Sequence, residues 1–188
     1  MALDMSKMRA KLDNLQGRGD GKKSNFWRPK DGEQTIRIVS PADGDPFKDF
    51  HFHYLEVDGQ RQSLLCPKKN FGDKCSICDF ASSLYREGTP ESIKQAKTLF
   101  ARQRFFSPVL VRGQEEMGVR IWGYGKMAYE SLLNLVLNPD YGDITDTEDG
   151  TDLNIIYGKP QGASFPQTKI HPRRRTSPLC DDAVGGSD

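Results

Sequence analysis

Three cysteines and a histidine stand at spacings that constrain this chain more than any other feature. Cys75 and Cys78 form a C-x2-C pair, and Cys66 precedes that pair by nine positions. His53 precedes Cys66 by thirteen positions. Zn²⁺ prefers a tetrahedron of thiolate and imidazole ligands, and a C-x2-C pair allows two sulfurs to bind one ion. We therefore predict one zinc ion held by three thiolates and one imidazole. Because four protein ligands leave no position for water, this ion is expected to be structural and not catalytic.

Spacing alone leaves other interpretations of these residues open. His51 competes with His53, because both side chains point to the same face of a predicted strand. The cysteines would also fit a hydrophobic core or a thioredoxin-like redox pair. The redox interpretation expects a βαβ setting, and it leaves Cys66 and the histidine unexplained. Cys180, in a polar tail, is expected to take no part.

Alternation of apolar and polar residues predicts a chain made mainly of β-strands. The predicted strands cover residues 34–39, 47–57, 61–65, 105–111, 119–124 and 153–157, with a last extended segment at 168–171. Helices are predicted over residues 78–85, 90–100 and 126–137. This pattern fits a mainly β fold with short helices (α+β), of the oligonucleotide-binding (OB-fold) type with a five-stranded barrel. A zinc-binding subdomain at about residues 50–88 is inserted into it, within a core that covers residues 26–179.

The net charge of +1 conceals zones of opposite sign. Residues 61–112 carry ten basic and four acidic side chains, whereas residues 113–152 carry two and nine. Residues 1–25 are predicted to form a basic, flexible N-terminal arm, and residues 180–188 a polar tail. A basic zone in a folded domain is where a polyanion could bind, although such blocks also occur on solvated faces and tails.

Membrane association and secretion are not expected for this chain. No run of about 18 apolar residues is present, which excludes a membrane-spanning helix. The first ten residues lack the apolar stretch of a secretory signal. We therefore expect an intracellular protein that makes no contact with a membrane.

Basic and aromatic residues are interleaved in two of the predicted strands. The first group is Arg102, Arg104, Phe105 and Phe106, and the second is Arg120, Trp122, Tyr124 and Lys126. Aromatic rings stack on unpaired bases and guanidinium groups hold phosphates, so we expect the face that carries Arg120, Trp122 and Tyr124 to be exposed and to bind single-stranded nucleic acid. The competing interpretation places these rings in the core. Further basic or aromatic candidates are Lys68, Lys69 and Phe71 near the zinc ligands, and Lys169, His171, Arg173, Arg174 and Arg175 near the last strand.

This arrangement of zinc ligands, followed by a basic segment that leads into Phe105 and Phe106, resembles the single-stranded DNA-binding (helix-destabilising) protein of T4-type bacteriophages. The resemblance covers roughly residues 26–179, and the thirteen-residue spacing between histidine and cysteine selects His53 over His51. It implies an OB-fold barrel with a zinc subdomain and a positively charged cleft lined by aromatic residues. By position, it implies DNA contacts from Arg102, Phe105, Phe106, Phe165, Phe71 and Tyr85.

The resemblance extends in kind to the two ends of the chain. The arm around Lys7, Arg9 and Lys11 resembles a basic segment that such proteins use for cooperative self-association along DNA, although their basic Ser/Thr motif is not found there. Such proteins also carry a long acidic C-terminal region that recruits replication partners, whereas in this sequence only Asp181, Asp182 and Asp188 follow Cys180 as acidic residues. Replication and recombination proteins are the partners that the resemblance implies.

We therefore predict a non-enzymatic protein that coats single-stranded DNA, without sequence preference, in phage DNA replication, recombination and repair in the host cytoplasm. The first alternative is a zinc-stabilised protein-interaction module that does not bind nucleic acid. The second is a metal-dependent nuclease that uses carboxylates of the acidic segment 140–152. Two-metal sites usually gather carboxylates from separate elements, so one Gly-containing loop is more typical of a solvated turn.

Overall fold

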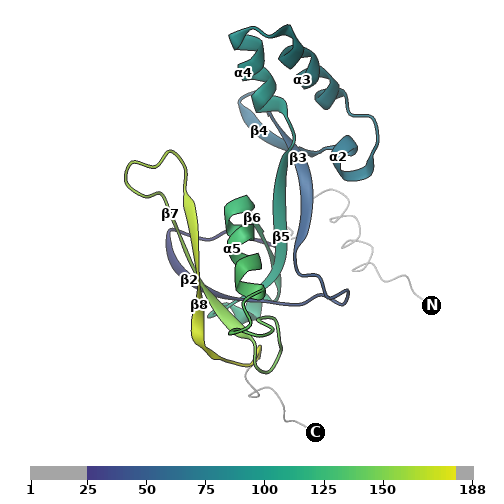
Figure 1. Ribbon diagram of the computed structural model, residues 1–188. Coiled ribbons are helices and arrows are strands. Elements are labelled where there is room, and N and C mark those ends of the chain that lie inside the picture. Colours follow the sequence, from purple (N-terminus) through teal and green to yellow (C-terminus); the bar gives the residue numbers. More distant parts are fainter. Residues whose placement is uncertain (1–24, 181–188) are drawn as a thin grey trace, which may run out of the picture.

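The computed structural model describes residues 25–180, in which eight strands form one sheet (Figure 1). Nearly all of the predicted N-terminal arm and of the predicted tail lie outside this range. The strands are β1 (Phe26–Trp27), β2 (Gly32–Ile38), β3 (Lys48–Val57), β4 (Gln60–Leu65), β5 (Arg102–Val111), β6 (Arg120–Tyr124), β7 (Thr151–Gly158) and β8 (Gln167–Thr176). The helices are α2 (Pro67–Phe71), α3 (Ser76–Glu87), α4 (Pro90–Leu99) and α5 (Lys126–Val136), with a short 3-10 helix at Glu115–Met117. None of these helices is both long enough and apolar enough to span a membrane.

Strand β5 is the central strand of the sheet. Its first half pairs with β3 and its second half with β2, both antiparallel, while β6 pairs along its middle. The main order is β1-β6-β5-β2-β7-β8, and β3 and β4 branch from β5. Within residues 25–180 no pairing joins β8 to β1, so the sheet is open and the predicted closed barrel is not what the structure shows. The mainly β class with short helices is confirmed.

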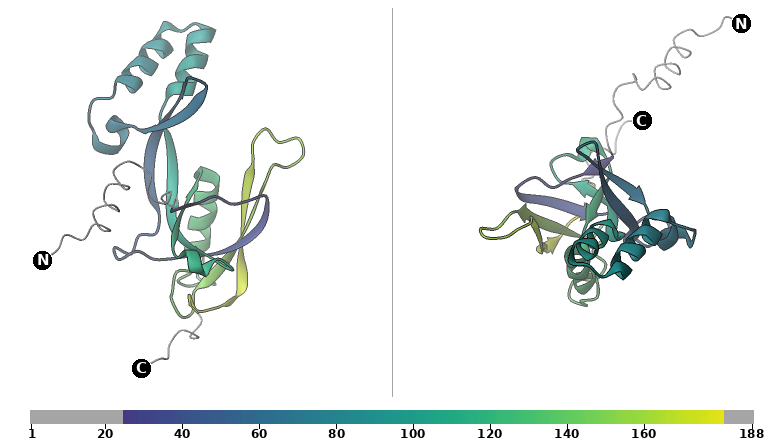
Figure 2. Two further views of the ribbon diagram at one scale, coloured as in Figure 1. Left: turned by 180° about the vertical axis from the view of Figure 1, so that it is seen from behind. Right: turned by 90° about the horizontal axis from the view of Figure 1, so that it is seen from above.

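The branch made by β3 and β5 connects two parts of the molecule. Seen from the front and from behind, these strands run as a ribbon from the main sheet to helices α2, α3 and α4 (Figures 1 and 2). We use the name zinc subdomain for the β3–β4 hairpin from His53 onward together with these three helices, up to Leu99. Helices α3 and α4 pack on each other through small buried residues, among them Ala81 and Ala96.

The main core lies between the sheet and α5, which crosses one of its faces (Figure 1). Alternation along the strands brings their apolar side chains to this face, as for Ile36 and Ile38 of β2. Helix α5 contributes Ala128, Leu132 and Leu135, whose spacing places them on one side of a helix. We call this side of the sheet the core face and the opposite side the outer face.

Three aromatic residues predicted to bind nucleic acid, two of them on a face predicted to be exposed, belong to this core. Phe105, Trp122 and Tyr124 are 4%, 1% and 3% exposed. The ring of Phe105 stacks on Tyr129 of α5 with centroids 3.9 Å apart, and the hydroxyl of Tyr124 is 2.6 Å from that of Ser107. The prediction that this face is exposed is therefore wrong. The physical reason is that α5 lies over it, and large rings fill the space between helix and sheet.

A buried ionic cluster holds the chain that follows β8 against β2 and β5. Arg37 Nε and Arg112 Nη2 donate to the same oxygen of Asp152, at 2.9 and 3.1 Å. Other N–H groups of the two arginines donate to the backbone oxygens of Ser177 and Leu179. Burial lowers the pKa of Arg37, and the carboxylate of Asp152 opposes that effect. One carboxylate and the backbone of residues 177–179 thus supply hydrogen-bond acceptors to both arginines.

Candidate metal centre and nucleic-acid interface

The four predicted zinc ligands converge at one buried point. His53 comes from β3, Cys66 from the residue after β4, and Cys75 and Cys78 from the start of α3. Their ligand atoms all lie within 4.8 Å of one another, and each residue is buried. The convergence of these four residues, predicted from spacing and the resemblance, is confirmed.

The distances between the ligand atoms fit a tetrahedral zinc ion. The Sγ atoms of Cys66 and Cys78 are 3.5 Å apart, and His53 Nε2 is 3.3 Å from Cys75 Sγ and 3.5 Å from Cys78 Sγ. From Zn–S and Zn–N bonds of about 2.3 and 2.0 Å, a tetrahedron has edges of about 3.8 Å between sulfurs and about 3.5 Å between sulfur and nitrogen. The cluster is therefore compatible with one structural zinc ion.

A backbone carbonyl orients the histidine of this cluster. His53 Nδ1 lies 2.7 Å from the carbonyl oxygen of Leu99, the last residue of α4. A hydrogen bond from Nδ1 leaves Nε2, the nitrogen that faces the thiols, with its lone pair free for a metal. His51 lies two residues earlier, and its backbone N–H donates to the side chain of Asn70 in α2. Its side chain is not a member of the cluster, so the choice of His53 over His51 is confirmed.

The thiols of the cluster differ in how readily they ionise. Burial, together with the neighbouring thiols of Cys66 and Cys75, raises the pKa of Cys78 to about 12. For Cys75, burial also favours the neutral thiol, but hydrogen bonds from the backbone N–H and thiol of Cys78 outweigh it and bring the pKa to about 7. Three adjacent thiolates repel one another, and a bound divalent cation removes this penalty. The donor set therefore fits zinc in charge as well as in geometry.

The local sequence explains how Cys66 reaches the cluster. Pro67 occupies the first turn of α2, where its missing N–H costs nothing, and Cys66 Sγ accepts a hydrogen bond from the backbone N–H of Lys69. Asn70 Nδ2 donates to the carbonyl oxygens of His51 and Cys66. Helix α2 therefore ties the end of β4 to β3 beside the metal ligands.

A groove lined by four phenylalanines lies on the outer face of the sheet. Its volume is about 360 Å³. The lining residues are Phe26, Lys48, Phe50, Phe52, Leu65, Phe106, Ser107, Pro108 and Ile121. We call this feature the aromatic groove. Only two of its lining residues are polar, so it presents almost entirely carbon to a ligand.

Phe106 occupies the middle of the aromatic groove. The centroid of its ring is 6.3 Å from that of Phe26, 6.1 Å from Phe50 and 5.9 Å from Phe52. Phe106 lies opposite Gly123 of β6, where an added Cβ would be only 3.0 Å from the ring. The absence of a side chain at Gly123 therefore leaves room for the ring of Phe106.

Two arginines lie beside the aromatic groove on the same face. Arg102 and Arg104 pair across the ladder with Phe52 and Phe50. Residues at even positions of β5 share the outer face, so these guanidinium groups and the ring of Phe106 belong to one surface. Within residues 25–180, neither arginine forms an ion pair. Of the predicted nucleic-acid contacts, the structure thus brings together Arg102, Arg104 and Phe106.

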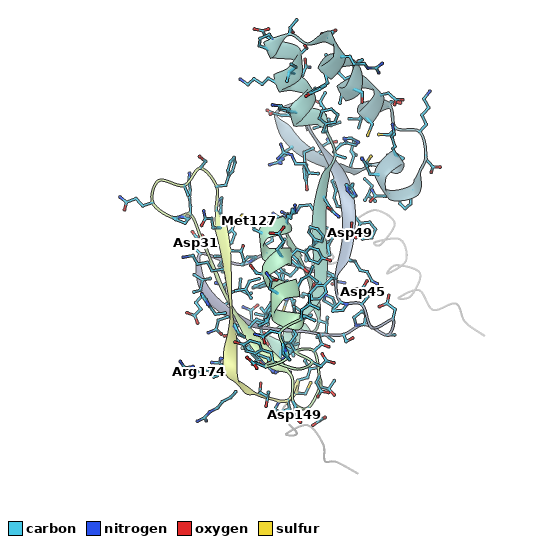
Figure 3. All side chains as sticks on the ribbon, in the orientation of Figure 1. Asp31, Asp45, Asp49, Met127, Asp149 and Arg174 are labelled. Atoms are coloured by element: carbon cyan, nitrogen blue, oxygen red, sulfur yellow. The ribbon has the colours of Figure 1, made fainter. Side chains whose placement is uncertain are left out.

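The other predicted contacts lie elsewhere. Arg120 is on the core face, half-buried, and its Nη2 donates to Gln114 Oε1 at 2.6 Å. Lys68, Lys69 and Phe71 are exposed on α2, Tyr85 is exposed on α3 beside Phe100, Lys126 begins α5, and Phe165 is exposed between β7 and β8. Arg173 and Arg174 are exposed on β8, and Figure 3 shows Arg174 at the end of the molecule away from the zinc subdomain. None of these residues lines the aromatic groove.

Three of the four groove phenylalanines were missed by sequence reasoning. Phe50 and Phe52 stand at alternate positions of β3, between His51 and His53, and Phe26 lies on β1 opposite Ile121. The alternation within FHFHY, residues 50–54, was a usable signal for the first two, because it places the histidines on one face and Phe50 and Phe52 on the other. Nothing in the local pattern marks Phe26, whose strand is two residues long.

The carboxylates of the acidic segment 140–152 do not form a metal site. In the part of the chain that the structure describes, the cluster of His53 and the three cysteines is the only group of at least three potential ligands that converges. Asp143 and Asp146 instead accept hydrogen bonds from backbone N–H groups of their own loop. Asp152 is bound by two arginines. The nuclease alternative therefore has no support in this segment.

The sequence matches no protein-family model, and it matches no curated protein.

Proposed function

We propose that this protein binds single-stranded DNA without sequence preference, through the aromatic groove and the adjacent arginines. The observation that carries the proposal is the gathering of four phenylalanine rings with Arg102 and Arg104 on one exposed side of a sheet. Single-stranded nucleic acid requires this combination, because bases stack on aromatic side chains while cationic groups follow the backbone. The proposal treats the open sheet crossed by α5 as a variant of the OB-fold.

In this proposal the bases enter the aromatic groove and the phosphates face the arginines. A phosphate that approaches Arg102 or Arg104 meets a guanidinium with no competing carboxylate within residues 25–180. The groove offers few donors or acceptors that could read the edge of a base, so stacking tolerates every base. Affinity should therefore depend little on sequence and fall steeply with salt.

Zinc would act in this proposal as a structural support for one end of the groove. His53 stands on β3 next to Phe52, and Cys66 follows Leu65, so two metal ligands adjoin two groove residues. The ion would fix the position of the β3–β4 hairpin and would perform no chemistry on DNA. A role in coating strands during phage DNA replication, recombination and repair, in the host cytoplasm, belongs to the same proposal.

The decisive experiment compares Phe106→Ala with Phe80→Ala. Stacking contributes about 1–3 kcal/mol per base, so Phe106→Ala should raise the Kd for oligo-dT roughly 5- to 150-fold. Phe80 is an exposed phenylalanine of α3 that does not line the groove, and its replacement should leave the Kd unchanged. The readout is the anisotropy of a labelled oligonucleotide, because Trp27 and Trp122 are buried and their emission reports folding. Equal Kd values for both variants would contradict the proposal.

A second candidate function follows from the apolar lining of the groove. The same carbon surface could accept an apolar side chain of a protein partner, as in the zinc-stabilised interaction module. The two functions differ in their salt dependence, because only a polyanion releases counterions when it binds. If oligo-dT fails to bind at low salt while the protein is folded and loaded with zinc, the interaction module becomes the better account.

A further inference from the structure

We infer that the DNA track extends from the aromatic groove onto the β3–β4 hairpin, where Tyr54 and Arg61 form a separate subsite for one more nucleotide. This inference rests on the proposed function and adds a binding element to it. Neither residue lines the aromatic groove.

The first observation is that Tyr54 continues the row of rings along β3. Phe50, Phe52 and Tyr54 stand at alternate positions, so they share the outer face and are about 6.6–6.8 Å apart along the strand. The ring centroids of Phe52 and Tyr54 are 6.4 Å apart, at an interplanar angle of 37°. The rings of Phe106, Phe52 and Tyr54 therefore follow one another, at centroid distances of 5.9 and 6.4 Å, from the groove onto the hairpin.

The second observation is the position of Arg61. Its guanidinium carbon lies 4.6 Å from the centroid of the Tyr54 ring, which is a cation–π contact. Arg61 stands opposite Glu56, and Ser63 stands opposite Tyr54, so Arg61 reaches diagonally across the ladder to cover the ring. A base can stack on a guanidinium plane that is itself stacked on a ring. The N–H groups of the guanidinium, at the edge of that plane, remain available to bind a phosphate.

The third observation concerns charge. Arg61 is exposed and forms no ion pair with any residue in the range 25–180. Arg61, Arg102 and Arg104 are therefore three guanidinium groups without a carboxylate partner on one face. Glu56 and Asp58, at the tip of the hairpin, would repel a phosphate, so the track should end at this subsite.

The experiment measures Kd for a ladder of oligo-dT from about 4 to about 16 nucleotides, the range of site sizes for such folds. A short oligonucleotide can occupy the groove alone, whereas a longer one must also reach the hairpin. Tyr54→Ala and Arg61→Gln should therefore leave the Kd of the shortest bound oligonucleotides unchanged and raise that of long ones roughly fivefold or more. Arg61→Gln should also reduce the slope of log K against log salt by about 0.7 for long oligonucleotides.

Three controls make the result decisive. Tyr54→Phe keeps the ring and should bind like the original protein at every length. Arg86→Gln removes an exposed arginine of α3, whose Nε bonds only within its helix, and should leave the Kd unchanged. Thermal unfolding followed by tryptophan emission identifies any variant that fails to fold.

The possible failures are distinguishable. If Phe106→Ala weakens binding but Tyr54→Ala and Arg61→Gln have no effect at any length, the subsite is absent and the proposed function stands. If the two variants weaken binding equally at all lengths, the hairpin does not act as a separate subsite, and the inference is wrong. If no oligonucleotide binds the folded protein, the proposed function fails and the inference fails with it.

Discussion

The two faces of strand β5 show how neighbouring residues of the same type acquire different roles. Phe105 and Phe106 are adjacent in the sequence, but one side chain stacks under α5 and the other lines the aromatic groove. What separates them is the element that covers each face: α5 packs on the core face, whereas the described residues that line the aromatic groove with Phe106 all come from strands. The aromatic residues of the sequence fit either a core or a binding surface. The packing of α5 decides which rings are buried and which line the groove.

Two groups of arginines differ in whether a carboxylate pairs with them. Arg37 and Arg112 share the buried carboxylate of Asp152 and hold the backbone after β8. Arg102 and Arg104 have no such partner among residues 25–180. A paired, buried guanidinium supports the fold, whereas an exposed unpaired one keeps its hydrogen-bonding groups available for a ligand.

Removal of zinc should have the largest effect on stability, and it should affect the zinc subdomain and not the main core. Structural zinc contributes roughly 10–16 kcal/mol of apparent binding free energy in small zinc domains, so chelation or Cys78→Ser should open the zinc subdomain. Hydrogen exchange should increase across residues 53–100 and stay slow in α5 and β7, which pack in a different core. Oligo-dT affinity should fall, because β3 carries both His53 and groove residues.

Cys180→Ser provides the matched control for this experiment. Cys180 is exposed and is not a member of the cluster, so its replacement should change neither the zinc content nor the exchange pattern. If chelation speeds exchange in α5 as much as in α3, the two parts do not fold as separate units, and the comparison between them fails.

The second largest effect should be the loss of stability when Phe105 is truncated, compared with the loss when Phe106 is truncated. Truncation of a buried phenylalanine to alanine costs about 3–5 kcal/mol, so Phe105→Ala should lower the free energy of unfolding by that amount. Phe106→Ala, at a partly exposed position, should cost less than about 1.5 kcal/mol. Urea unfolding followed by the emission of Trp27 and Trp122 measures both, because these residues lie in the core. Equal losses of stability would mean that Phe106 is a core residue as well.

The sequence predicts much of this fold because the patterns are local. The alternation in residues 34–39 and 105–111 matches β2 and β5, and Thr89 and Pro90 mark the start of α4, where Thr89 accepts a hydrogen bond from the N–H of Ser92. Strand β1 has two residues and is formed by pairing with β6, so no local pattern announces it. Whether the sheet closes into a barrel depends on whether its edge strands pair with each other. The number of strands carries no information about that pairing.

The two parts of the candidate site also differ in how far the sequence predicts them. The metal cluster was predictable, because the coordination chemistry of zinc imposes a spacing on its ligands. For the groove, the sequence predicts a surface of basic and aromatic residues but not its location. Arg120, Trp122 and Tyr124 form the same kind of pattern as the arginines and phenylalanines of β3 and β5. The position of α5 buries the first pattern and leaves the second exposed, and this is a tertiary contact that periodicity does not encode.

The smallest expected effect concerns Lys48, a lining residue of the groove that is paired, unlike Arg102 and Arg104. Its Nζ lies 2.6 Å from Asp43 and 3.2 Å from Asp45 (Asp45 is labelled in Figure 3). The hydrogen bond from Lys48 lowers the pKa of Asp43, so this carboxyl stays ionised and the pair persists at neutral pH. Both partners are exposed, and a DNA phosphate has to displace them before it can use the ammonium group.

Neutralising the partners should release Lys48 for DNA. In Asp43→Asn with Asp45→Asn, we expect oligo-dT affinity to rise about two- to fivefold and the salt slope to steepen by about 0.7, as for one more phosphate contact. Asp49→Asn removes a charge from the opposite face of β3, where Asp49 accepts a hydrogen bond from Gln103. If Asp49→Asn gives the same gain, general attraction explains it. If Lys48→Gln in the double variant cancels the gain, the ammonium group itself contacts the strand, and the difference between paired and unpaired cations governs the strength of the interface.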